Sequence, residues 1–144
     1  MKETVISREV AEQEIERAID IFDGDIKSDD DRENFLAAIM AGRVNIDEAK
    51  GTLEYTFAVP LEQKSSDSVK SVTLREPDSA DLEYINKGQR VTVSADGTAT
   101  MDLSDLYVKT TRMLTRMSGL PVALCDRIKR RDMAVLNSLC NFFG

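Results

Sequence analysis

Side chains that could carry out chemistry are few in this 144-residue chain, and histidine is missing altogether. Its absence removes the commonest general base near neutral pH, the usual partner of a catalytic serine or cysteine, and the commonest metal ligand. No glycine-rich phosphate-binding loop of a familiar spacing is present either. We therefore expect no catalytic residues, no metal site and no cofactor, and the sequence predicts a protein that is not an enzyme.

The densest run of carboxylates, residues 23–31, looks superficially like a calcium-binding loop. It lacks the required spacing. If such a loop began at Asp23, the third acidic position would fall on Lys27 and the glycine position on Ser28. We interpret this run as a solvated loop followed by the start of a helix.

Two other groups of reactive residue types have structural explanations. Glu76, Asp78 and Asp81 surround Pro77, but nothing beside them supplies a nucleophile, and acids at this place suit the start of a helix. Cys125 and Cys140 lie in an apolar helical region, where reduced buried thiols are expected. Neither group predicts a reactive site.

Charge is unevenly distributed along the chain, whose net charge is -7. Residues 1–50 carry 14 acidic and 7 basic side chains, whereas residues 101–144 carry 4 acidic and 7 basic ones. The overall acidity argues against general nucleic-acid binding. For the basic C-terminal third, three interpretations remain open: a solvated face, a docking surface for an acidic protein surface (including residues 1–33 of this protein), and a phosphate-binding surface. Its basic side chains are Lys109, Arg112, Arg116, Arg127, Lys129, Arg130 and Arg131.

The first 50 residues predict two amphipathic helices. One spans residues 7–22, with Ser7 as its cap and Gly24 as its end, and the second begins near Ser28 and ends at Gly42. Helices this short are marginal alone, so they must pack on the rest of the chain or on another subunit. We expect residues 1–50 to form an N-terminal helical arm on a domain of residues 51–144.

Residues 52–60 and 69–74 alternate apolar and polar side chains and predict an antiparallel β-hairpin ended by Pro77. A short helix capped by Asp78 or Ser79 should follow. Residues 89–101 predict a second small hairpin, with a disordered or lid-like loop as the alternative.

Apolar residues return to helical spacing at residues 102–118 and 130–143, which predicts a helix at each place. Pro121 should begin a short helix between them. The last helix is apolar on two seams, so it should be central to the fold or covered by another chain. The fold class expected is α+β, mainly helical, with a central antiparallel hairpin and helices on both sides. No apolar run approaches the ~20 residues that span a bilayer, so we expect a cytoplasmic protein.

Two motifs stand out in the second half of the chain. The first is Val72-Thr73-Leu74-Arg75-Glu76-Pro77 with the helix start that follows it, and the second is Leu114-Thr115-Arg116-Met117-Ser118-Gly119-Leu120-Pro121. Together they resemble the protein E type of phage tail assembly chaperone. The resemblance covers roughly residues 52–144. It implies a non-catalytic assembly factor, made in the host cytoplasm from a phage or prophage, that binds the tape measure protein and supports polymerisation of the tail tube. It also implies that the tail-tube protein is a further partner and that the chaperone forms homo-oligomers.

A chaperone for a helical rod needs an apolar surface with a charged rim. Our candidates for the apolar surface are Met113, Met117, Leu120, Met133, Leu136 and Phe143. The alternative is that these side chains fill the core. Our candidates for the rim are Lys109, Arg112, Arg116 and Arg130. We also expect acidic N-terminal helices to meet the basic C-terminal third of a neighbouring copy. A small DNA-binding regulator that uses the C-terminal helix–Gly–helix region is the alternative.

Overall fold

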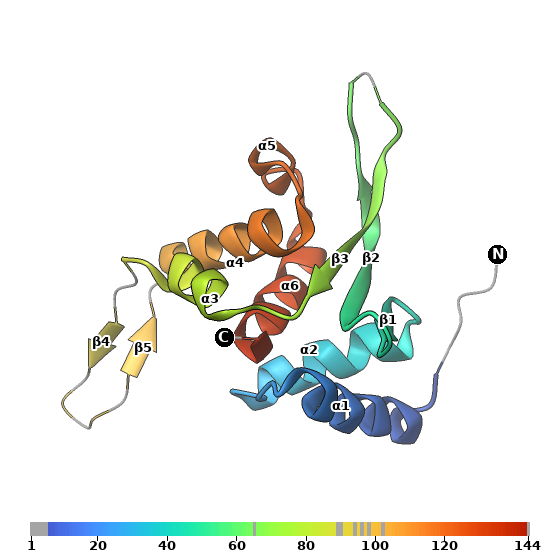
Figure 1. Cartoon of the computed structure of the whole chain (residues 1–144), viewed down its shortest axis with the longest axis horizontal. Coiled ribbons are helices and arrows are strands. Elements are labelled where there is room, and N and C mark those ends of the chain that lie inside the picture. The colour runs from blue at the N-terminus through green and yellow to red at the C-terminus, as the bar shows by residue number, and fades with distance from the viewer. Residues whose placement is uncertain are drawn as a thin grey trace.

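The described part of the chain combines helices with a three-stranded antiparallel sheet, as the sequence predicts (Figure 1). The computed structural model describes residues 6–64, 66–88, 91–93, 95, 97, 99–101 and 103–143. Within these ranges the helices are α1 (Arg8–Phe22), α2 (Asp29–Met40), α3 (Ser79–Asn86), α4 (Leu103–Ser118), α5 (Val122–Cys125) and α6 (Arg130–Phe143). The strands are β1 (Val44–Asp47), β2 (Thr52–Leu61), β3 (Val69–Arg75), β4 (Val91–Val93) and β5 (Ala99–Met101).

The predicted hairpin is confirmed, and one strand was missed. β2 pairs with β3 in antiparallel register, Leu53 opposite Leu74. β1 adds a third strand on the other edge of β2, with Ile46 opposite Leu53. At its far end the β2–β3 hairpin projects beyond the helices (Figure 1). β4 and β5 form the second small hairpin, although Gln89, Arg90, Ser94, Asp96 and Thr98 lie outside the described residues.

Residues 1–50 are not a separate arm in this structure. β1 belongs to the sheet, so a boundary after residue 50 would cut the turn that joins β1 to β2. Buried side chains of α1 and α2, such as Ile15 and Phe35, belong to the same core as those of β2 and α6. The amphipathic helices find their partner within the chain because their apolar faces complete this core.

α6 is the central helix, as its two apolar seams indicated. It lies against α2, α4 and β2, and its buried side chains come from several directions around its axis. They include Leu136, Leu139, Cys140, Phe142 and Phe143. Both cysteines are buried free thiols, and burial raises the pKa of Cys140 to about 11, which makes this thiol unreactive near neutral pH.

Local signals set most helix ends. Ser7 and Ser28 each accept a hydrogen bond from a backbone N–H three residues later, and Gly42 adopts a left-handed φ of 73° after α2. Gly24 has a different role from the one expected, because Asp23 is the left-handed residue at the end of α1. A Cβ atom at Gly24 would lie only 2.3 Å from the Phe142 ring, so glycine is required there by close packing on α6.

Candidate protein-binding site

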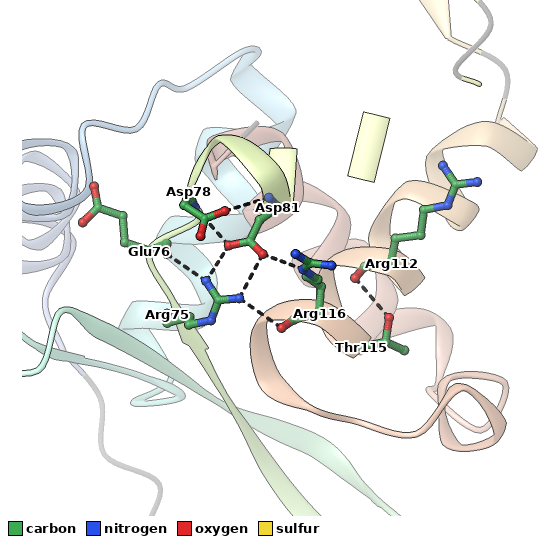
Figure 2. A network of polar contacts seen from close by, with 7 residues as sticks. All are labelled: Arg75, Glu76, Asp78, Asp81, Arg112, Thr115 and Arg116. Atoms are coloured by element: carbon green, nitrogen blue, oxygen red, sulfur yellow. Dashed lines mark hydrogen bonds and ion pairs between the residues drawn. The ribbon is translucent and has the colours of Figure 1, made fainter. Parts of the chain in front are cut away.

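The two sequence motifs meet in one ion cluster between β3, α3 and α4 (Figure 2). Asp81 is fully buried and accepts hydrogen bonds from both Nη atoms of Arg75, with Arg75 Nη2 2.9 Å from Asp81 Oδ1. Arg116 donates its Nε to the same carboxylate at 2.7 Å. Asp81 also closes a capping box with Asp78 at the start of α3. We call these residues, Arg75, Asp78, Asp81 and Arg116, the Asp81 cluster.

The Asp81 cluster is a structural element that joins three parts of the fold. Hydrogen bonds from Arg75, helped by the backbone N–H of Asp78 and by Arg116, hold the pKa of Asp81 well below its usual range despite burial. Arg75 also donates to the Arg116 carbonyl. Arg116 therefore interacts with other residues of the same chain and does not form part of a binding rim.

Two other predicted rim residues are similarly occupied. Arg112 donates to the carbonyls of Tyr84, Ile85 and Lys87, and so fastens the end of α3 to α4. The guanidinium carbons of Arg112 and Arg116 lie 5.8 and 5.5 Å from the centre of the Tyr84 ring, within cation–π range. Lys109 is only 8% exposed. Of the four predicted rim residues, only Arg130 is exposed without an intramolecular side-chain partner in the part of the chain that the structure describes.

The predicted apolar surface is largely the protein core. Five of its six members are buried: Met113, Met117, Leu120, Leu136 and Phe143. Helical spacing identified the buried faces of α4 and α6 correctly, but these faces are covered by the rest of the same chain. In this conformation they are not available to a partner, and only Met133 remains partly exposed.

Met133 and Arg130 lie together in a surface groove between α4 and α6. The groove has a volume of about 410 Å³. It is lined by Tyr107, Cys125, Asp126, Ile128, Arg130, Met133, Ala134 and Asn137. On one wall the Tyr107 hydroxyl donates to Asp126 at 2.7 Å, which raises the pKa of Tyr107. Tyr107 is 39% exposed. We call this depression the α4–α6 groove.

A second depression of about 380 Å³ adjoins the first, because both are lined by Asp126 and Ile128. Its other wall is the β2–β3 hairpin at Val59 and Pro60. Arg127 donates to the Glu62 carbonyl and thus braces this hairpin against the turn before α6. The two depressions together give a surface that is partly apolar and continuous from α4 to the hairpin.

Three basic side chains line this surface, Arg130 in the first depression and Arg127 and Lys129 in the second. The next residue of α6, Arg131, lines a different pocket beside Tyr55 and Ala58. All four are exposed, and none forms an ion pair with another described residue. We call them the basic cluster. The sequence had placed them among candidate phosphate-binding residues but had not selected Arg127, Lys129 or Arg131 for the rim.

Sequence reasoning missed Asp132, which is fully buried immediately after the basic cluster. It accepts hydrogen bonds from the Tyr55 hydroxyl at 2.6 Å and from the backbone N–H groups of Ala58 and Val59 at 2.8 and 3.1 Å. The two backbone donors lie where the β2–β3 register shifts between Thr56 and Leu61. Burial, together with this bond to Asp132, raises the pKa of Tyr55 far above its usual value. Asp132 therefore fixes α6 to the irregular part of β2.

No family model, curated protein or solved structure matches this chain. Within the described ranges, no group of three or more acidic or cysteine side chains is arranged to hold a metal ion. No helix there is long and apolar enough to cross a membrane. The α4–α6 groove and the basic cluster are thus the features that best fit a binding role.

Proposed function

We propose that this protein is a non-catalytic assembly chaperone that binds an elongated helical protein through the α4–α6 groove. The observation that carries the proposal is the groove itself, where the exposed parts of Tyr107, Ile128 and Met133 are bordered by unpaired cations of the basic cluster. Grooves with an apolar floor and a charged rim are typical receptors for amphipathic helices. Met133 suits such a site because its flexible side chain adapts to different surfaces.

The resemblance to phage tail assembly chaperones supplies the identity of the client. On this proposal the client is the tape measure protein, with the tail-tube protein as a second partner, and binding takes place in the host cytoplasm during tail assembly. The geometry supports the resemblance in one respect. Both motifs that carry it converge on the Asp81 cluster, so their separate positions in the sequence have one common structural purpose.

The alternative of a DNA-binding regulator receives less support from the geometry. A helix that reads the major groove must present a free face along its length. α6, the helix after the turn, is instead surrounded by α2, α4 and β2. The basic cluster occupies only the start of α6, so a phosphate contact there would leave the bases unread.

The proposal is tested with a purified helical fragment of the tape measure protein encoded beside this gene, by measuring its affinity for the chaperone in a titration. Met133→Glu places a charge in the groove and should weaken binding by about tenfold or more, since each 1.4 kcal/mol is a factor of ten. Val10→Glu is the matched control. Val10 is an exposed apolar residue on α1, outside the groove, so its substitution should leave the affinity unchanged.

Two results would contradict the proposal. One is a wild-type chaperone that binds no helical fragment of the client. The other is equal affinity of the wild type and Met133→Glu, which would show that the client binds elsewhere.

A further inference from the structure

The pocket that Arg131 lines lies where α2, β2 and α6 meet, separate from the α4–α6 groove. Its volume is about 250 Å³, and it shares no lining residue with either depression described above. Two arginines line it, Arg43 from the segment that follows α2 and Arg131 from the first turn of α6. We call it the Arg43–Arg131 pocket.

Small side chains make room for this pocket. Ala37, Ala38 and Ala41 form its α2 wall and Ala58 belongs to its β2 wall, and an alanine side chain ends at Cβ. The space equals the volume of about eight water molecules at ~30 Å³ each. Pockets for drug-sized molecules begin near ~300 Å³, so this one suits a more compact ligand with an apolar part.

Hydrogen bonds within the fold hold the β2 wall and one of the arginines in place. Arg43 Nη1 donates to the Phe57 carbonyl at 3.3 Å. Tyr55 is buried, and its hydroxyl donates to Asp132, which also accepts a hydrogen bond from the backbone N–H of Ala58. The wall is therefore ordered before a ligand arrives, which lowers the entropy cost of binding.

The charges around the pocket favour an anion. Arg43 and Arg131 line it, and none of the described lining residues is acidic. Both guanidiniums also act on the Tyr55 hydroxyl, where they oppose the rise in its pKa. The carboxylate of Asp132, bonded to Tyr55, offsets one of these two charges, so about one positive charge remains. The start of α6 adds the positive end of its helix dipole.

We propose that the Arg43–Arg131 pocket binds a compact organic carboxylate, with its carboxylate on Arg131 and its apolar body against the alanines of α2. A guanidinium presents paired N–H donors that match the two oxygens of a carboxylate. A monoanion suits the remaining charge better than a phosphate dianion does. This site is independent of the proposed client binding, because the pocket and the α4–α6 groove share no lining residue.

Titration of the full chain with benzoate, followed in two-dimensional amide NMR spectra, tests the site. Benzoate should shift the amide signals of Ala38, Ala41 and Ala58 saturably, with a dissociation constant of about 1 mM, a value typical of so small a ligand. Benzamide has nearly the same shape without the charge and should bind about tenfold more weakly. Inorganic phosphate should also bind more weakly than benzoate.

Two variants and a matched control locate the ligand. Arg131→Gln removes the exposed cation and should weaken benzoate binding about tenfold. Ala37→Leu should block the pocket from the exposed side of the α2 wall and keep the spectrum of a folded protein, because leucine favours a helix. Arg32→Gln is the control, since Arg32 belongs to α2 but does not line the pocket, and it should bind benzoate as the wild type does.

An absence of saturable shifts at millimolar benzoate overturns the proposal, and so does equal affinity for benzoate and benzamide. Unchanged benzoate binding in both Arg131→Gln and Ala37→Leu overturns it as well, because the ligand would then lie elsewhere. Tighter binding of phosphate than of benzoate overturns the choice of a carboxylate. None of these titrations contains a client, so their failure leaves the client-binding test with Met133→Glu unaffected.

Discussion

α3 and α6 each have a buried aspartate in their first turn, but the two aspartates have different partners. Each helix has a fully buried aspartate at its third position, Asp81 in α3 and Asp132 in α6. Asp81 is neutralised by two arginines, whereas Asp132 is held by a tyrosine hydroxyl and two backbone N–H groups. The cations next to Asp132 are exposed and form no ion pair with a described residue.

This difference distinguishes charged side chains that hold the fold together from charged side chains that are available to a partner. At α3 every charge of the cluster has an internal partner, so the arginines there fix the positions of β3, α3 and α4. At α6 the internal carboxylate needs no cation, which leaves Lys129, Arg130 and Arg131 free for an external anion. The presence of arginine in a motif is thus a poor guide to a binding surface unless its partners are known.

Removal of the Asp132 carboxylate should have the largest effect. Asp132→Ala leaves the buried Tyr55 hydroxyl without an acceptor and frees two backbone donors, so we expect a loss of about 3 kcal/mol in unfolding free energy. Urea denaturation measures the loss. Tyr55→Phe in the Asp132→Ala background should recover part of it, because it removes the orphaned hydroxyl. A loss under about 1 kcal/mol would show that water replaces the carboxylate.

Asp81→Asn should have the next largest effect, a loss of about 2 kcal/mol in unfolding free energy measured by urea denaturation. The loss is smaller than for a wholly enclosed pair because Arg75 and Arg116 are 44% and 42% exposed and can turn to solvent. Glu83→Gln, an exposed substitution on the same helix, serves as the control and should change stability little. Equal stability of the two variants would refute a structural role for the Asp81 cluster.

Acidification should reduce the contribution of Asp81 to stability. Because the pKa of Asp81 is lowered in the folded state, its contribution to stability is present above the unfolded pKa and is lost as pH falls below about 4. Asp81→Asn lacks this titration. The stability difference between wild type and variant, measured by urea denaturation at several pH values, should therefore narrow on acidification. A constant difference would mean that the arginines do not stabilise the ionised form.

Reversing charge at the start of α6 should have the smallest effect on stability, and in the opposite direction. Lys129→Glu with Arg131→Glu places acids at the positive end of the helix dipole, which should raise stability by about 0.5 kcal/mol. Thermal unfolding in dilute solution at low salt, where the helix dipole is least screened, checks this sign. A clear destabilisation would show that these cations have an internal role.

Periodicity was enough to predict most of the elements, including the buried faces of α4 and α6. It could not say what covers those faces, because Met113 in a core and Met113 in a binding groove give the same spacing. β1 was missed because a strand of four residues with Val44 and Ile46 as its apolar positions gives too short an alternation. Gly24 was assigned to a helix end because its contact with Phe142, far away in the sequence, has no local signal.

The candidate site was less predictable than the fold. The structure leaves Met133 partly exposed and Arg130 exposed, but the other cations predicted for the rim, Lys109, Arg112 and Arg116, are buried or bonded within the chain. Their partners, such as Asp81 for Arg116, lie 35 residues away in the sequence. Only the folded arrangement shows which charges are already used.

The central position of α6 has a consequence for the order in which the chain can acquire its structure. Asp132 binds Tyr55 across 77 residues, and Asn141 binds Asp31 across 110. Polar groups of β2 and α2 therefore obtain these hydrogen bonds only after α6 has taken its place in the fold. Such long loops make folding comparatively slow, and a nascent chain halted before Arg130 would expose apolar side chains of its earlier helices.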